Sequence, residues 1–67
     1  MKITLNNRQE VFEREKMTFE DLIVDKKFTF KMLVTKKNGI LVRKEDRNST
    51  YINDGDDIIV LHLISGG

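Results

Sequence analysis

Residues 58–64 constrain the fold more than any other segment, because every residue in it except His62 is aliphatic. An apolar run of this length, rich in β-branched residues, predicts a strand whose alternate side chains point to opposite faces. The two faces would carry Ile58, Val60 and Ile64 on one side and Ile59, Leu61 and Leu63 on the other. Either a second layer covers both faces, or one aliphatic row stays outward and marks a surface for a partner.

The start of the chain predicts a hairpin. Residues 2–6 alternate between polar and apolar, which is the period of a strand with one buried face. Asn6-Asn7 follows, and asparagine tolerates the positive φ of a tight turn. Residues 9–13 would form the returning strand, in which either Val11 or Phe12 faces inward.

The middle of the chain predicts a helix followed by a strand. Thr18, with Asp21 three residues later, resembles a capping box, in which a hydroxyl and an acid accept hydrogen bonds from free backbone amides at the start of a helix. We therefore expect a helix over residues 19–27. Residues 28–35 then alternate with the period of a strand. We expect the inward row of this strand to belong to the core and to consist of Phe28, Phe30, Met32 and Val34.

Two further turns organise the second half of the chain. Asn38-Gly39 is the strongest hairpin signal in the sequence, and a short strand over residues 40–42 follows it. Residues 43–52 are polar and irregular at first and end in a brief expected strand. Residues 53–56 predict a turn in which Gly55 takes a positive φ.

Composition excludes most catalytic and ligand-binding classes. The 67 residues make one small domain, since a chain of this size buries only about 60% of its unfolded surface. The net charge of +1 provides no field for capturing nucleic acid or a membrane surface. The chain has no cysteine, which excludes disulfides, thiolate metal sites and chemistry on its own sulfur.

The remaining polar residues predict neither catalysis nor a metal site. His62 is the one histidine and has no neighbouring triad partners. Asp54, Asp56 and Asp57 lack the later acid that a calcium loop requires, so we assign them to turn chemistry.

The basic residues gather in the middle of the chain. We expect them to cover solvated faces rather than to form a patch for an acidic partner. Seven of the 12 basic residues lie there: Lys26, Lys27, Lys31, Lys36, Lys37, Arg43 and Lys44. Met1 leads directly into the first patterned strand without an apolar targeting segment, so the sequence predicts a soluble, cytoplasmic protein without a membrane partner.

Ser65-Gly66-Gly67 is the one segment whose composition the fold does not require. Glycine has no Cβ, so this tail is thin and flexible enough to enter a narrow cleft, and at full extension it reaches roughly 10 Å. The α-carboxyl of Gly67 is ionised at neutral pH, because such groups titrate near roughly 3.5. The alternative is an ordinary frayed chain end. We divide the chain into one domain over residues 1–64 and a flexible functional tail over residues 65–67.

The order of these elements resembles that of the β-grasp sulfur carriers, and most closely the ThiS-like carriers of the ThiS/MoaD group within the ubiquitin-like superfamily. The resemblance covers essentially the whole chain and implies an α+β fold: a mixed sheet of four to five strands packed on one helix, with a flexible Gly-Gly tail. The motifs that carry it are residues 2–6, 18–22, 38–42, 53–56 and 64–67.

The chain also departs from the pattern of these carriers. Family members often carry proline just after the position of Val42 and tryptophan a few residues later, where this chain has Arg43 and Arg47. A short insertion precedes Asn38. These differences affect the choice of subfamily, and therefore of the sulfur acceptor, more than the fold.

The resemblance implies a carrier rather than an enzyme. In such carriers a ThiF-like enzyme uses ATP to adenylate the terminal carboxylate, and a sulfur donor system with a persulfide converts it to a thiocarboxylate. The sulfur then passes to a ThiG-like thiazole synthase. ATP belongs to the activating enzyme, and no cofactor is bound by this chain. The resemblance places the sulfur on Gly67, with Gly66 as its flexible approach.

The resemblance also implies which face of the last strand is exposed. Ile58 and Val60 would point to the core. The partner-binding residues would then be Ile59, Leu61, Leu63, Ile64 and Ser65.

Three alternatives stay open at this point. One is the small subunit of molybdopterin synthase or a carrier for another sulfur pathway, because a shared fold does not fix the acceptor. Another is a ubiquitin-like protein modifier, which uses the same adenylate and ends in an isopeptide bond to lysine. The third is an interaction module with an idle tail.

Overall fold

The computed structural model describes residues 1–28 and 32–63. Within this part of the chain, a five-stranded sheet has the strand order β2-β1-β7-β4-β5, and β3 and β6 form a separate pair. The elements are β1 (Lys2–Leu5), β2 (Arg8–Val11), β3 (Met17–Thr18), α1 (Phe19–Asp25), β4 (Leu33–Lys37), β5 (Ile40–Val42), a short 3₁₀ helix (Lys44–Asp46), β6 (Tyr51–Ile52) and β7 (Asp57–His62).

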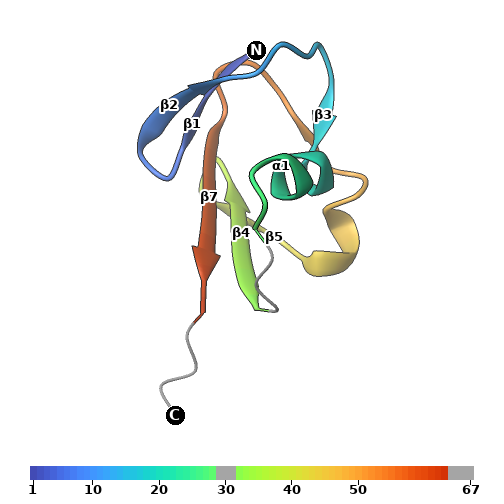
Figure 1. Ribbon diagram of the computed structural model, residues 1–67. Helices are drawn as coiled ribbons and strands as arrows, with labels where there is room; N and C mark the ends of the chain where they lie inside the picture. The colour runs from blue at the N-terminus through green and yellow to red at the C-terminus, as the bar shows by residue number, and fades with distance from the viewer. Residues whose placement is uncertain (29–31, 64–67) are drawn as a thin grey trace.

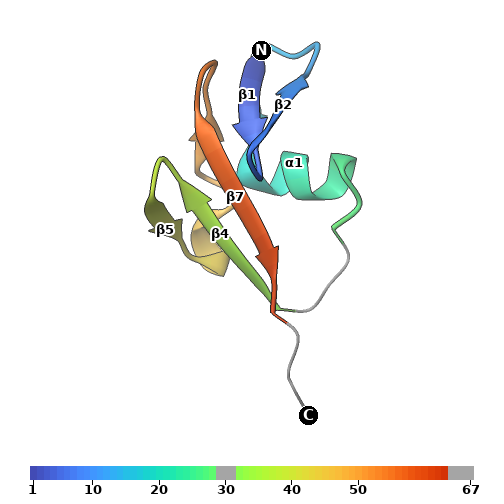
Figure 2. The ribbon, with the colours of Figure 1, turned by 90° about the vertical axis from the view of Figure 1, so that its left-hand side faces the viewer.

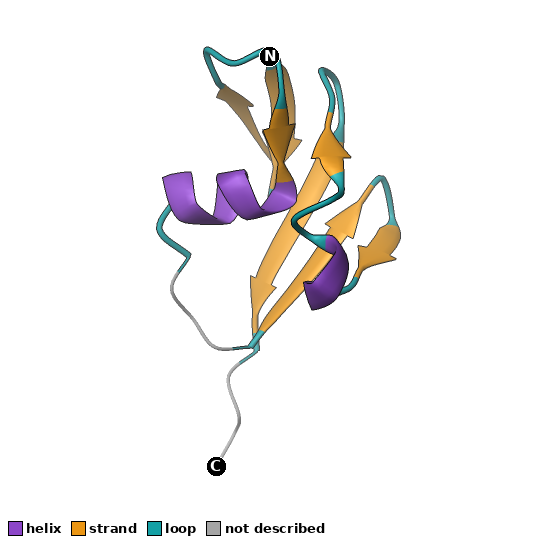
Figure 3. Ribbon diagram, turned by 90° about the vertical axis from the view of Figure 1, so that its right-hand side faces the viewer, coloured by secondary structure: helices purple, strands orange, loops and turns teal. Residues whose placement is uncertain are grey.

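The last strand, β7, lies in the middle of the sheet. It runs parallel to β1 and antiparallel to β4, so the sheet is mixed. α1 and the 3₁₀ helix lie on the same face of this sheet (Figure 1, Figure 3). This arrangement confirms the predicted β-grasp fold. No helix in the described ranges is long and apolar enough to cross a membrane.

α1 begins as the sequence predicts. The Thr18 hydroxyl accepts a hydrogen bond from the Asp21 amide at 3.1 Å, and the Asp21 carboxylate accepts one from the Thr18 amide at 3.0 Å. The Thr18 amide thereby lowers the pKa of Asp21 below its ordinary value. The helix ends at Asp25, earlier than expected, because Lys26 caps it and Lys27 takes a left-handed φ of 58°.

The core lies between α1 and the inner face of the sheet. Phe12 packs against this core from the end of the first hairpin, whereas Val11 is exposed, which decides between the two inward candidates there. The buried hydrophobic residues are Ile3, Leu5, Met17, Phe19, Leu22, Ile23, Val42, Ile52, Ile58 and Val60.

The predicted asparagine hairpins are both present. Asn6 and Asn7 have φ values of 50° and 68°, and Asn38 and Gly39 have values of 50° and 83°. Two-residue hairpins need a left-handed conformation at both positions, and asparagine and glycine adopt it at low cost. These turns set the β1–β2 and β4–β5 pairings.

The expectation for the third strand is wrong in its inward row. β4 begins only at Leu33, and the side chains that face the core are those of Leu33 and Thr35. Phe28 does pack partly against the core, while Phe30 lies outside the described residues. Met32 and Val34, which were expected inside, are not part of the core. The inward-facing positions of β4 are therefore shifted by one residue relative to the prediction, so the opposite set of side chains faces the core.

A buried hydrogen-bond pair explains this orientation. The Thr35 hydroxyl donates to the Val42 carbonyl at 2.6 Å and accepts from Arg47 Nε at 3.1 Å. Arg47 also donates from Nη2 to the Leu33 carbonyl at 2.8 Å. A buried hydroxyl is tolerated only when its hydrogen bonds are made. Arg47 therefore makes a polar Thr35 possible on the inner face.

Asp56 joins two turns of the fold. Its carboxylate accepts the Asn53 amide at 2.7 Å and Asn38 Nδ2 at 3.0 Å, and Lys37 Nζ lies 3.6 Å away. Burial alone would raise the pKa of Asp56, but these donors outweigh it and hold the pKa below the ordinary value of 3.8. The neighbouring Gly55 has a φ of 86°, as the predicted turn requires.

We expect Asp56→Ala to destabilise the fold by about 1–3 kcal/mol, because it leaves the Asn53 amide without its acceptor. The ionised Asp56 stabilises the fold fully above the unfolded-state pKa, and this contribution is lost as the pH falls through the lower folded-state pKa. Urea unfolding at a series of pH values should therefore show that the difference in free energy of unfolding between wild type and Asp56→Asn becomes smaller at acidic pH. A difference independent of pH would contradict the stabilising role of the ionised Asp56.

Candidate functional site

The structure places the predicted contact residues of β7 on the sheet face opposite α1. Ile58 and Val60 are buried at 0% and 4% exposure, whereas Leu61 and Leu63 are 51% and 49% exposed. Ile59 is partly exposed. The predicted orientation of the strand is therefore confirmed, and its role in docking stays a prediction. The other predicted site residues, Ile64, Ser65, Gly66 and Gly67, lie outside the described residues.

The side chain of Asn6 forms hydrogen bonds with β7 just beyond the end of β1. Its side-chain Nδ2 donates to the Val60 carbonyl at 3.1 Å, and its Oδ1 accepts from the Val60 amide at 2.9 Å. The amide side chain thus takes the place of one further residue of β1. On the other side of β7, the Leu63 amide donates to the Met32 carbonyl at 3.0 Å. The strand is thus held as far as Val60 on the β1 side and as far as Leu63 on the β4 side.

Three strand segments contribute to an apolar surface on the face opposite α1, which is turned toward the viewer in Figure 2. In the sheet register, Leu61 lies opposite Val34, and Lys36 lies opposite both Ile59 and Leu41. We call this surface the outer patch. Its apolar members are Met32, Val34, Leu41, Ile59, Leu61 and Leu63.

Three members of the outer patch were not among the predicted contact residues. Leu41 and Met32 are each 59% exposed, and Val34 is partly exposed. The sequence pattern assigned Met32 and Val34 to the core, so turning β4 over by one residue moves them to the outer patch. The signal that identifies Val34 and Leu41 is the cross-strand register with Leu61 and Lys36, which no local pattern contains.

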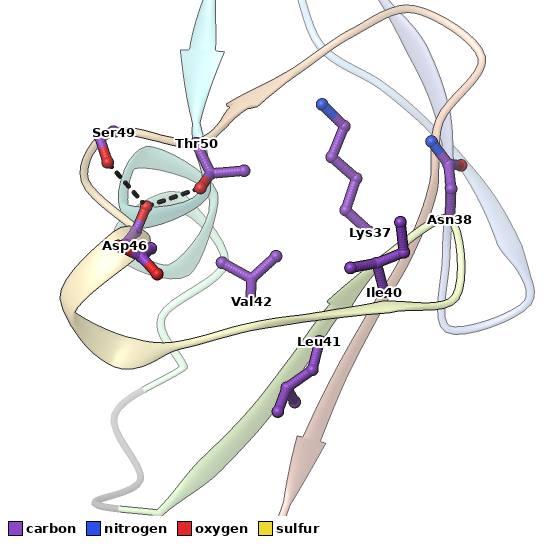
Figure 4. Close-up of a pocket in the computed structure, with 8 residues that line it drawn as sticks. All are labelled: Lys37, Asn38, Ile40, Leu41, Val42, Asp46, Ser49 and Thr50. Atoms are coloured by element: carbon purple, nitrogen blue, oxygen red, sulfur yellow. Dashed lines mark hydrogen bonds between the residues drawn. The ribbon is translucent and has the colours of Figure 1, made fainter.

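A cavity beside the β4–β5 hairpin, with Leu41 of the outer patch in its lining, has a volume of about 510 Å³ (Figure 4). Its polar groups are engaged in holding the fold. The hydroxyls of Ser49 and Thr50 both donate to the Asp46 carbonyl, at 3.2 and 2.7 Å. Lys37 Nζ donates to the Tyr51 carbonyl at 2.7 Å. These contacts describe a structural surface rather than an assembled set of acid, base and nucleophile.

The described residues contain no group of three or more His, Cys, Asp or Glu side chains placed to hold a metal ion. His62 is exposed at the end of β7. The outer patch includes Leu61 and Leu63, which lie just before residue 64 in the chain.

The sequence matches the model of the ThiS family over residues 2–67. No curated protein matches it. Two solved structures from Geobacter metallireducens are similar over the whole of this chain. A crystal structure of thiamine biosynthesis protein (ThiS) is 23% identical, is covered over 100% of its length and has a TM-score of 0.89. An NMR solution structure of a thiamine biosynthesis protein is 25% identical, is covered over 88% of its length and has a TM-score of 0.82.

The Asn6 contacts generate a stability prediction. We expect Asn6→Gly to destabilise the fold by about 1–3 kcal/mol, because it removes both hydrogen bonds to Val60 while keeping a residue suited to positive φ. Urea unfolding measures the loss, and faster hydrogen exchange of the Val60 amide would localise it.

Asn7→Gly is the matched control, because Asn7 also has a positive φ. We expect this control to change stability by less than about 0.5 kcal/mol. Equal effects of the two substitutions would refute the assigned role of the Asn6 side chain.

Proposed function

The chain belongs to the ThiS family, and from that premise we propose that it is a sulfur carrier in thiamine biosynthesis which bears its sulfur as a thiocarboxylate on Gly67. The observation that carries the proposal is the family match, which extends to residue 67 and so includes the Gly-Gly end. The similar structures from Geobacter metallireducens, both of thiamine biosynthesis proteins, support the same pathway.

The proposed chemistry begins by making the Gly67 carboxylate electrophilic. One carboxylate oxygen attacks the α-phosphorus of ATP, an acyl–oxygen–phosphorus linkage forms, and pyrophosphate leaves. The terminal sulfur of a persulfide then attacks the acyl carbon and displaces AMP. A thiol then attacks the donor's sulfur in the resulting acyl disulfide. A new disulfide forms between the thiol and the donor, the sulfur–sulfur bond to the acyl group breaks, and the thiocarboxylate remains on the chain.

In this scheme the chain is a substrate and carrier, and its partners provide the catalytic groups. A ThiF-like enzyme carries out the adenylation, a sulfur donor system supplies the persulfide, and a ThiG-like thiazole synthase accepts the sulfur. Gly66 and Gly67 suit this task because a segment without Cβ atoms can enter a narrow active site. Because activation consumes ATP, we place the reaction in the cytoplasm.

The outer patch is the proposed docking surface for these enzymes. It includes the outward side chains of β7, and residues 64–67 follow that strand after Leu63. An enzyme that covers the patch therefore lies beside the start of the tail. Contiguous apolar side chains on an exposed face are typical of protein interaction sites.

We expect Ile59→Lys and Leu61→Asp each to weaken binding to the activating enzyme by about tenfold or more, because each buries a charge in an apolar contact. Val24→Asp is the control, since Val24 is 66% exposed on α1, away from the outer patch. We expect its affinity to stay within about twofold of wild type. Calorimetric titration measures the three affinities, and unchanged binding by both patch variants would rule out this docking surface.

Intact-mass spectrometry tests the carrier function directly. After incubation with ATP, a ThiF-like enzyme and a sulfur donor, we expect the mass change of one oxygen replaced by sulfur, mapped to the C-terminal peptide. A chain lacking Gly67 should not acquire it, because its carboxylate falls short of the reacting position. A wild-type chain that no cognate activating enzyme modifies would refute the carrier proposal. Isopeptide conjugates to lysine would point instead to a protein modifier.

A further inference from the structure

Lys36 lies between two members of the outer patch, at the end of the patch nearest the Asn38-Gly39 turn. β4 sits between β7 and β5, and the register places Lys36 opposite Ile59 on one side and Leu41 on the other. Val34, two residues earlier on the same strand, shares its face. Lys36 is exposed, and among residues 1–28 and 32–63 it forms no ion pair.

The neighbours of Lys36 do not pair with its charge in this structure. Ile59, Leu41 and Val34 offer no side-chain acceptor. Asp57, two residues before Ile59 on the same face of β7, forms no ion pair with Lys36 in the described part of the structure. In the free chain water solvates the ammonium group. A partner that excludes this water must either supply an acceptor or leave a desolvated charge, which is strongly unfavourable.

We propose that Lys36 determines partner specificity, and that the surface which covers the outer patch is apolar with one carboxylate placed opposite Lys36. This inference rests on the proposed function, because it takes the activating enzyme as the partner. The charge pair fixes the position of the enzyme over the sheet, and it disfavours apolar surfaces that lack the carboxylate. The charge pair therefore gives partner specificity to an apolar contact that is otherwise non-directional.

The competing explanation for Lys36 is that it only keeps an apolar sheet face from self-association, as charged residues on exposed strands often do. The two explanations differ in what removal of the charge does to binding. If Lys36 faces a carboxylate, an apolar replacement leaves that carboxylate buried in the interface without a partner and weakens binding. If Lys36 only prevents self-association, an apolar replacement enlarges the contact and keeps or tightens binding.

The test compares Lys36→Met and Lys36→Glu in the full chain, with affinity for the ThiF-like enzyme measured by calorimetric titration. Lys44→Glu is the control, because Lys44 is also exposed, lies on the 3₁₀ helix, and the substitution changes net charge as Lys36→Glu does. We expect Lys36→Met to weaken binding by about fivefold or more and Lys36→Glu by more than about tenfold, while Lys44→Glu stays within about twofold. Thermal unfolding of each variant should match wild type, because the substituted side chains are exposed.

A charge reversal in the enzyme identifies the facing group. Among Asp→Lys and Glu→Lys variants of the enzyme surface, one should restore the affinity of Lys36→Glu and weaken that of wild type. Wild-type affinity or better for Lys36→Met, or absence of any restoring variant, would overturn the inference while leaving the carrier function intact. A wild-type chain that the enzyme neither binds nor modifies would overturn both proposals.

Discussion

The buried hydrogen bond between Arg47 and the Thr35 hydroxyl determines which side of β4 faces the helix. Thr35 sits in the row between Val42 and Val60, where an unsatisfied hydroxyl would be costly. Because strand side chains alternate, an inward Thr35 requires Lys36 to point outward. A slip of one residue would place Lys36 under α1 and turn Thr35 to solvent. The composition of the outer patch therefore depends on a contact made on the opposite side of the sheet.

β7 serves the core with one face and the outer patch with the other. Ile58 and Val60 complete the core, and the same backbone positions Ile59 and Leu61 outside. The strand needs support along its whole length for this, and the Asn6 amide supplies it after β1 has turned away. The two roles of β7 fit the proposed carrier function, because a strand that holds a surface for an enzyme in a fixed position needs no catalytic group of its own.

Local sequence signals predicted the elements that depend on adjacent residues. The capping box at Thr18 and the hairpin at Asn38-Gly39 each need only a few neighbouring positions, and the structure contains both. The inward row of β4 could not be read in this way. The alternating pattern has two possible phases there, and the choice depends on the Arg47 guanidinium, which is distant in sequence. For the same reason the residue pattern alone left the outward face of the last strand open. The family resemblance implied Ile59, Leu61 and Leu63, whereas the patch members on β4 and β5 were not predicted.

Two more features escaped prediction because long-range contacts create them. The short strand before α1 pairs with β6, and the Phe19 amide donates to the Thr50 carbonyl at 2.9 Å. The 3₁₀ helix ends next to Arg47, whose carbonyl accepts the Glu20 amide at 3.2 Å. Neither segment carries a strong local signal, and each is ordered by what it packs against.

The parallel pairing of β1 with β7 has a consequence for how the chain reaches this fold. It pairs residues about fifty positions apart, such as Leu5 and Ile58. The two hairpins close locally and form early, whereas β7 must wait for a large loop to close. Until then β1 and β4 each expose an unpaired edge that favours association with other chains. Insertion of β7 removes both edges at once, so the strand at the centre of the outer patch also ends the aggregation-prone stage of folding.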